Sequence, residues 1–407
     1  MAELKGVEYL KRKLNDKRRR VLLRYKYYDM KNYVPDFGIA TPPQLQAMAW
    51  TLGWCGKAVD CIADRLVFKG FKNDLFGLSE IYDQNNPDIL TRSASQAALI
   101  GSCSFIYIYV DDSGYPRMEC IDGANATGMI DRVTGLLTEG YAVLERDTDG
   151  KPVTEAYFLP GRTEYAFTEN RKMRTRVFTH DAPYPLLVPV INKADSTRPF
   201  GHSRISRACM DIMAAAVRTV KRSEISAEFY SFPQKWVTGL EEGAEKFDKW
   251  QATMASLLAF TKDNEGDSPT VGQFSQGAMT PHMDQLRMFA SLFAGETGLT
   301  LDDLGFPSDN PSSADAIRSQ HETLRLAARR AQADFGSGFL NAGFLAACLR
   351  DNYSYLRRQL YNTKPSWGPI FEPDAVQLSG IGDAVIKIQQ AFPDYFTEEK
   401  LNELTGI

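Results

Sequence analysis

The turn Gly298-Leu-Thr-Leu-Asp-Asp-Leu-Gly-Phe-Pro-Ser-Asp-Asn-Pro311, rich in glycine, proline and aspartate, organises the predicted fold. It separates two predicted helices. The helical spacing of apolar residues predicts a helix with a polar face over 281–296 and a much longer helix over 312–361. Ser312 or Ser313 can cap the longer helix, because a hydroxyl accepts a hydrogen bond from the first free amides.

The predicted helix over 312–361 is too long for the core of one domain to cover. At ~1.5 Å per residue, roughly 50 residues would span about 75 Å. A helix of this length that is rich in alanine needs flanking helices, and a ring of identical subunits is one way to supply them. The residues that recur at helical spacing are Ala314, Ile317, His321, Leu324, Ala328, Ala331 and Phe335.

Three glycines, Gly336, Gly338 and Gly343, fall inside this helix. A glycine costs about 1 kcal/mol relative to alanine in a helix interior, so three of them weaken the helix locally. Two interpretations are open. The glycines permit close packing against a neighbouring element, or they allow the helix to kink.

Residues 203–297 predict two helices that bracket an insert. The first helix covers 203–231 and ends before Pro233, and the second is the helix over 281–296. Between them we predict strands at 235–238, near 258–261 and at 270–274, and a helix over 243–258. The insert has a tip too hydrophilic for a core turn, formed by Lys262, Asp263, Asn264, Glu265 and Asp267.

The segment 103–190 changes to the alternation of β-strands. Hairpins are predicted over 104–121, 140–159 and 164–178, and together they indicate an antiparallel sheet with one polar face. The proline-rich connection 182–189 is predicted to be an extended hinge. Helices are predicted before this sheet, over 3–31, 43–66 and 87–99, and after the long helix, near 381–392 and from Thr397.

The predicted helix over 3–31 is strongly basic, with the runs Lys11-Arg-Lys13 and Lys17-Arg-Arg-Arg20. Such a helix can contact DNA or a membrane surface. It can equally lie on the surface of the protein with its arginines in water. The sequence leaves these interpretations open.

Composition describes a globular protein of two or three domains. The chain has 407 residues, 43% of them hydrophobic, and a net charge of −4. A DNA-coating protein is normally basic, so the charge argues against that class but not against a channel wall along which DNA slides. Neither a stretch of ~18 apolar residues nor an apolar signal segment is present, so we expect an intracellular protein that does not span a membrane.

The cysteines do not predict a metal or redox site. No C-x-x-C pair occurs, so reduced thiols in the core are expected rather than zinc ligands. The six positions are Cys55, Cys61, Cys103, Cys120, Cys209 and Cys348.

Motifs for catalysis are equally weak. Gly53-Trp-Cys-Gly-Lys57 only superficially resembles a phosphate-binding loop, and His321-Glu322 lacks the second histidine of a zinc protease. The spacing of Asp195, His202 and Ser203 permits a hydrolytic triad, but no nucleophile elbow surrounds them. We therefore predict that the chain is not an enzyme and needs no cofactor.

Two acidic pairs remain as candidates for a divalent cation, Asp111-Asp112 and Asp302-Asp303. Both pairs lie in predicted turns, where aspartate caps the main chain without a metal. The second interpretation is the simpler one, and we predict no bound metal.

Five motifs, in their order along the chain, resemble the portal proteins of tailed bacteriophages of the siphophage type. The resemblance covers roughly residues 30–407. The motifs are Pro199-Phe-Gly-His-Ser-Arg-Ile-Ser206, Phe232-Pro-Gln-Lys-Trp-Val-Thr-Gly239, Pro269-Thr-Val-Gly-Gln-Phe274, Gly298 to Phe306 followed by Asn310-Pro-Ser-Ser-Ala-Asp-Ala-Ile317, and Gly380-Ile-Gly-Asp-Ala-Val-Ile-Lys387.

The resemblance implies an α+β fold of portal type with a fixed order of parts. These are a wing (1–200, helices and then an antiparallel sheet), a first stem helix (201–231), a clip (232–279), a second stem helix (280–297), a channel loop (298–312), a long wing helix (313–361) and a crown-like helical region (362–407). In such a fold a kink at the three glycines would turn the long helix from the channel into the wing.

The resemblance also implies a function. A ring of about twelve copies would sit at one capsid vertex of the virion, let double-stranded DNA in and later out, and assemble in the host cytoplasm. The implied partners are the terminase large subunit and a head–tail adaptor, both at the clip tip, with the major capsid protein and the scaffolding protein. The residues implied at the channel are Thr300, Asp302, Asp303, Phe306, Ser308, Asp309 and Asn310.

Two other functions are weighed against this one. Another ring-forming virion protein, such as a head–tail adaptor, is usually much shorter and lacks two helices that bracket an insert. A metal-dependent DNA hydrolase would use the acidic turns, and metal-stimulated cleavage would reveal it.

Overall fold

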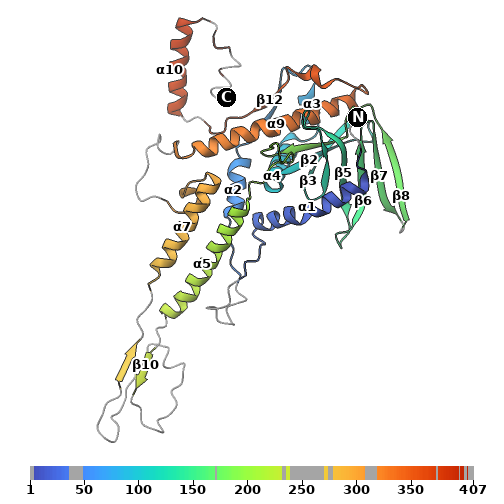
Figure 1. Ribbon diagram of the computed structural model, residues 1–407. Helices are drawn as coiled ribbons and strands as arrows, with labels where there is room; N and C mark the ends of the chain where they lie inside the picture. The colour runs from blue at the N-terminus through green and yellow to red at the C-terminus, as the bar shows by residue number, and fades with distance from the viewer. Residues whose placement is uncertain are drawn as a thin grey trace, which may run out of the picture.

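Two helices project from a mixed body of helices and sheets (Figure 1). The computed structural model describes residues 4–35, 49–169, 172–231, 235–238, 270–273, 278–307, 319–372, 375–393, 395–397 and 401. The projecting helices are α5 (Arg207–Ser231) and α7 (Thr280–Thr297). The structure is therefore α+β, as the sequence predicts.

The N-terminal part of the body contains four helices and one short strand. These are α1 (Val7–Tyr28), α2 (Trp54–Ala63), β1 (Phe68–Lys72), α3 (Leu78–Asp83) and α4 (Pro87–Gly101). The predicted helix over 43–66 is shorter, because Gly53 stands at the N-cap of α2; residues 43–48 lie outside the described residues. The hydrophobic core extends from α2 to α4 and onward to the strands.

The segment 103–190 forms two antiparallel sheets and not one. The first has the order β3-β2-β9, with β2 (Cys103–Val110), β3 (Pro116–Asp122) and β9 (Leu187–Ile191). The second has the order β4-β5-β6-β7-β8, with β4 (Ala126–Ile130), β5 (Leu137–Arg146), β6 (Pro152–Leu159), β7 (Arg162–Glu169) and β8 (Lys172–Thr179). The three predicted hairpins are confirmed as β2–β3, β5–β6 and β7–β8.

The prediction of a hinge over 182–189 is wrong at its C-terminal end. Residues 187–189 belong to β9, where Pro189 lies opposite Phe105 of β2. A proline has no amide hydrogen to donate, but β9 is an edge strand of its sheet, so this loss is tolerated. The segment therefore returns to the first sheet and completes it.

The long helix α9 (Glu322–Arg350) lies across the body and contributes much of the core (Figure 1). Phe335, Phe339 and Phe344 are fully buried in it. It has 29 residues and ends at Arg350, so the prediction that it continues to Tyr361 is wrong. Asn352 adopts a left-handed conformation (φ 47°), and the amide of Tyr353 donates to the Cys348 carbonyl, which closes the helix end.

The chain after α9 returns to the body. A short 3-10 helix, η3 (Arg357–Leu360), leads to β12 (Lys364–Trp367), which pairs with β1. The predicted C-terminal helix is present as α10 (Ala375–Ala391), and the residues of the helix predicted from Thr397 lie mostly outside the described residues. No helix of the described residues has the length and apolar character to cross a membrane.

The three glycines of α9 mark close packing, and the helix continues without a break through them. A Cβ atom built at Gly336 would lie 2.8 Å from Pro365, and one at Gly338 would lie 3.1 Å from the Pro189 carbonyl oxygen. At Gly343 it would lie 3.3 Å from Leu78. β12, β9 and α3 therefore approach the bare faces of α9, and packing accounts for these glycines better than the kink.

Candidate channel and assembly surfaces

The projecting helices α5 and α7 pack against each other through small and apolar side chains. Met213, Ala216 and Val217 of α5 are buried, as are Ala290, Phe293 and Ala294 of α7. Farther along the pair, Thr219 Oγ1 donates to Gln285 Oε1 (3.1 Å). α5 begins at Arg207 and not at 203, because Ser206 Oγ accepts the amide of Cys209 (3.1 Å) and caps the helix.

The base of this pair is joined to the body by Arg204, a buried cation. Its Nε donates to the carbonyl oxygen of Ala58 in α2 (3.2 Å), and its Nη2 donates to the carbonyl oxygen of Thr297 at the end of α7. A cation suits this position because the C-terminus of a helix carries partial negative charge. Burial lowers the pKa of Arg204 from its ordinary value. A guanidinium nevertheless stays protonated in proteins, so Arg204 keeps its charge.

The turn after α7 is folded tightly onto the body. Gly298 adopts a left-handed conformation (φ 68°), and its amide donates to the Ala294 carbonyl (2.7 Å). A short 3-10 helix, η2 (Asp302–Leu304), comes next. Asp303 accepts hydrogen bonds from the amide and hydroxyl of Thr300, and the amide of Asp303 donates to that hydroxyl.

The predicted channel residues therefore differ in their surroundings. The carboxylate of Asp303 lies against its own turn and 3.9 Å from Nδ1 of His321, near the start of α9. Phe306 is half-buried and packs against the core, whereas Asp302 is exposed. The structure supports Asp303 as a capping residue more directly than as a group that faces DNA. Ser308, Asp309 and Asn310 lie outside the described residues.

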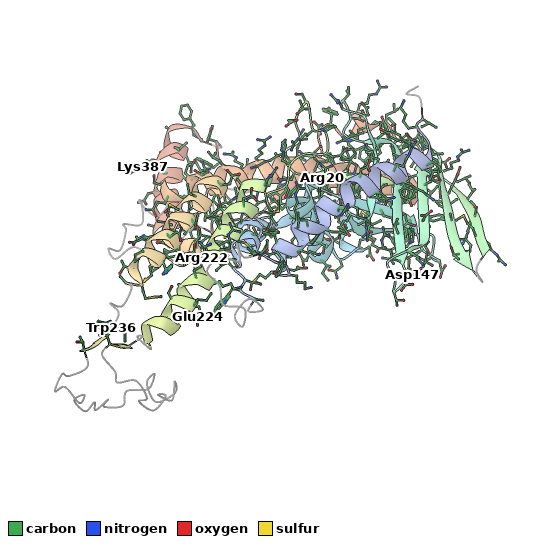
Figure 2. The ribbon with its side chains drawn as sticks, turned by 60° about the horizontal axis from the view of Figure 1, so that its bottom comes forward. Arg20, Asp147, Arg222, Glu224, Trp236 and Lys387 are labelled. Carbon is green, nitrogen blue, oxygen red and sulfur yellow. The ribbon has the colours of Figure 1, made fainter. Side chains whose placement is uncertain are left out.

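The far end of the projecting pair carries a two-stranded hairpin. β10 (Lys235–Thr238) pairs antiparallel with β11 (Thr270–Gln273), which confirms the strands predicted there. Figure 2 shows Trp236 at this end, far from the labelled Asp147 of the body. The helix predicted over 243–258, the strand near 258–261 and the tip residues Lys262, Asp263, Asn264, Glu265 and Asp267 lie outside the described residues.

An exposed stripe on α7 was not found by the sequence analysis. Met288, Leu292 and Gly295 follow one another at helical spacing on the side opposite the buried Ala290 and Phe293. Met288 and Leu292 are 49% and 52% exposed. A Cβ atom at Gly295 would meet no atom within 4 Å, so close packing within the described residues does not account for this glycine in the last turn of α7. The i, i+4, i+7 spacing of these three residues in the sequence could have predicted that they share one face of the helix.

The candidate catalytic residues do not assemble into a hydrolytic site. Nε2 of His202 lies 2.6 Å from Oδ2 of Asp195, but Ser203 Oγ donates to the Ile100 carbonyl instead (2.6 Å). Hydrogen bonds to Asp195, first from His202, hold the pKa of this carboxyl well below its usual range. The hydroxyl therefore holds the main chain of α4 and is not aligned as a nucleophile.

The acidic pair Asp111-Asp112 also caps a turn. Asp111 accepts hydrogen bonds from the hydroxyl of Ser113, from Nε of Arg117 and from the amides of Tyr115 and Ser113, and these bonds lower its pKa. Within the described residues, no group of three potential metal ligands converges. All six cysteines are unpaired, and five of them are buried; Cys120 is half-buried.

Comparison with known proteins gives two relatives of the same kind. The portal protein of Mycobacterium phage D29 is 27% identical over 347 residues, which are 79% of this chain and 69% of the relative. The portal protein of Mycobacterium phage L5 is 26% identical over 352 residues, covering 78% and 68%. No family model matches the chain.

A solved structure with a similar fold is a chain from the neck of a native GTA particle, with a TM-score of 0.46 and 12% identity over 87% of this chain and 89% of that chain. The two phage relatives, and not this neighbour, carry the comparison: the chain is similar to bacteriophage proteins. More specifically, it is similar to the portal proteins of two mycobacteriophages, which confirms the resemblance that its motifs indicate.

Proposed function

We propose that this chain is the subunit of a phage portal, a closed ring at one capsid vertex through which DNA enters and leaves the head. One observation carries the proposal. A pair of antiparallel helices projects from the wing and presents an uncovered stripe, Met288, Leu292 and Gly295, that a neighbouring copy can cover. A ring closes when each copy meets the next through two different surfaces, and about twelve copies are expected.

The parts of the subunit then receive distinct roles. Residues 298–312 form the channel loop, in which Asp302 faces the DNA and Asp303 keeps the turn rigid. An acidic lining discourages strong contacts with phosphate, so DNA can slide. The hairpin β10–β11 leads to the clip tip, which binds the terminase large subunit during packaging and a head–tail adaptor afterwards.

No reaction is assigned to the subunit. The acidic turns cap main-chain amides, and the histidine–aspartate pair lacks an aligned nucleophile. Force for packaging comes from the terminase, while the portal supplies a wall, a constriction and docking surfaces. The wing contacts the major capsid and scaffolding proteins, so the portal becomes part of the virion after assembly in the host cytoplasm.

Electron microscopy of the purified protein tests this function. We expect rings with a central hole, and a reconstruction should place 300–310 at the constriction and 262–267 at the narrow end. A compact monomer at high concentration would contradict the proposal. A ring with 300–310 on its outer surface would contradict only the channel loop.

The stripe on α7 gives a prediction about assembly. Changing Met288→Glu and Leu292→Glu together should raise the concentration needed for ring formation at least about tenfold, because charges would enter an apolar interface. Light scattering over a concentration series measures this change. The free energy of unfolding of the subunit, measured in urea, should stay within about 0.5 kcal/mol of the parent, since both side chains are exposed.

A matched control makes the same chemical change elsewhere. Leu75 and Val133 are exposed apolar residues of the wing. The pair Leu75→Glu and Val133→Glu adds the same charge and should leave assembly unchanged. If both double variants raise the concentration needed for ring formation equally, net charge and not the α7 stripe determines ring formation.

A further inference from the structure

The two edges of the five-stranded sheet differ in their surroundings. At the β4 edge, α1 lies alongside, and Lys13 Nζ donates to the carbonyl oxygen of Gly128 in β4 (2.7 Å). At the opposite edge, β8 pairs with β7 on one side only, and no strand of the described residues lies on its outer side. The described part of the chain covers one edge and leaves the main chain of the other open.

The side chains of β8 also suit a partner. Successive residues of a strand point to opposite faces, so Met173, Thr175 and Val177 share one face while Arg174 and Arg176 share the other. All five are exposed, including two large apolar residues, Met173 (71%) and Val177 (55%). An edge strand with exposed apolar residues is a template for a further strand.

The position of β8 restricts which protein can reach it. Figures 1 and 2 both show β8 as the part of the wing farthest from α5 and α7, with its open edge turned away from them. If α5 and α7 surround the ring axis, as the proposed function requires, this edge lies on the outer rim. A neighbouring copy at the side of the wing does not reach the rim, whereas a protein that surrounds the ring does.

We propose that the open edge of β8 binds, by strand addition, an extended segment of a different protein in which acidic and apolar residues alternate. The main chain of β8 supplies the hydrogen bonds of a new antiparallel or parallel ladder. Specificity comes from the two faces: apolar residues of the segment pack on Met173 and Val177, and its carboxylates lie beside Arg176. This inference rests on the proposed function for the identity of the rim, but not for the binding itself.

The arginines have a second possible role, because charges on an edge strand prevent unwanted pairing. The two roles predict different responses of β8 to an acidic strand. A protective arginine leaves β8 unpaired, whereas a binding arginine increases the affinity for that strand. The experiment therefore uses the charge of Arg176 as its variable.

The test uses the full chain in its assembled form and a fluorescent eight-residue peptide of alternating valine and glutamate, matched to the eight residues of β8. Binding is followed by fluorescence anisotropy. We expect the same peptide, N-methylated at alternate residues, to bind about tenfold or more weakly, because its ladder hydrogen bonds are removed. Hydrogen exchange should show slower exchange of amides within 172–179 when the peptide is bound.

The variant Arg176→Glu is expected to weaken binding of the peptide about tenfold by placing like charges opposite each other. Its control is Arg358→Glu, the same change at an exposed arginine of η3, which should keep the parent affinity within about twofold. The proposal is overturned if Arg176→Glu binds like the parent, or if peptide binding leaves exchange over 172–179 unchanged.

Three further outcomes separate this inference from the alternatives. Without peptide, the amides of 172–179 could become more protected from hydrogen exchange as the protein concentration rises. That result would show that a second copy occupies the edge, and it would overturn the choice of partner. Rings that form normally but do not bind the peptide would overturn the strand-addition site and leave the portal assignment intact. Peptide binding by a chain that never forms rings would contradict the portal assignment and the rim position alone.

Discussion

Replacing Arg204 by alanine is expected to lower the free energy of unfolding by about 4 kcal/mol, because the change removes a buried charged donor and leaves the main-chain carbonyl of Thr297, at the end of α7, without this donor. The guanidinium also donates to the main-chain carbonyl of Ala58, inside α2. Since these carbonyls belong to α2 and to the end of α7, the variant should also loosen the projecting helices from the body. Urea denaturation measures the first effect, and hydrogen exchange over 280–297 measures the second.

The controls separate charge from shape. Arg204→Lys keeps the charge but has a single nitrogen, so we expect an intermediate loss of about 2 kcal/mol. Arg207→Ala removes an exposed arginine three residues later and should change stability by less than about 0.5 kcal/mol. A loss below about 1 kcal/mol for Arg204→Ala would show that the base of the projecting pair does not depend on this side chain.

Replacing Glu139 by alanine is expected to lower the free energy of unfolding by about 3 kcal/mol and to release α1 from the five-stranded sheet. Glu139 is 1% exposed, and its carboxylate accepts the amides of Lys5 (2.8 Å) and Gly6 (3.1 Å) and the hydroxyl of Tyr157 (2.9 Å). The carboxylate therefore anchors the start of α1, where the helix dipole favours negative charge. Faster hydrogen exchange over 7–28 and a lower urea midpoint would measure the loss.

A second glutamate on the same strand provides the control. Glu145 of β5 is exposed, and Glu145→Ala should change stability by less than about 0.5 kcal/mol. The variant Glu139→Gln keeps one acceptor oxygen but turns an NH₂ group toward a donor. Its loss in free energy of unfolding should therefore lie between those of Glu145→Ala and Glu139→Ala. If Glu139→Ala leaves exchange over 7–28 unchanged, the apolar contacts of Leu10 and Leu14 hold α1 without the carboxylate.

Much of the local structure could be predicted because it depends on neighbours in sequence. The hairpins have their turn residues and alternating strands within a few positions of one another, so β5–β6 and β7–β8 appear where expected. The helices α4, α5, α7 and α10 also appear, with ends that differ by a few residues. The end of α5 nearest the body was misplaced because Ser203 and Ser206 are both plausible caps in sequence, and only Ser206 caps a helix.

The site was predicted less completely than the fold. The turn after α7 was located, but the role of Asp303 depends on the hydroxyl of Thr300 and on His321, whose proximity is a tertiary result. The basic helix α1 shows the same limit. Lys13 and Lys17 point inward, where their ammonium groups lie over the ring of Phe200, whereas Arg12, Arg19 and Arg20 are exposed. Periodicity predicts a face of a helix, but not which cation meets an aromatic ring.

Residue type and spacing along the chain were enough to predict the main elements, their order and the relationship to phage portal proteins. The division of the strands into two sheets, the end of α9 at Arg350 and the open edge of β8 emerge only in the folded chain. Each of these depends on contacts between distant residues, such as Pro189 with Phe105 in the first sheet and Arg350 with the Phe76 carbonyl at the end of α9. Such contacts are selected by the free energy of the whole packed core, which no local pattern contains.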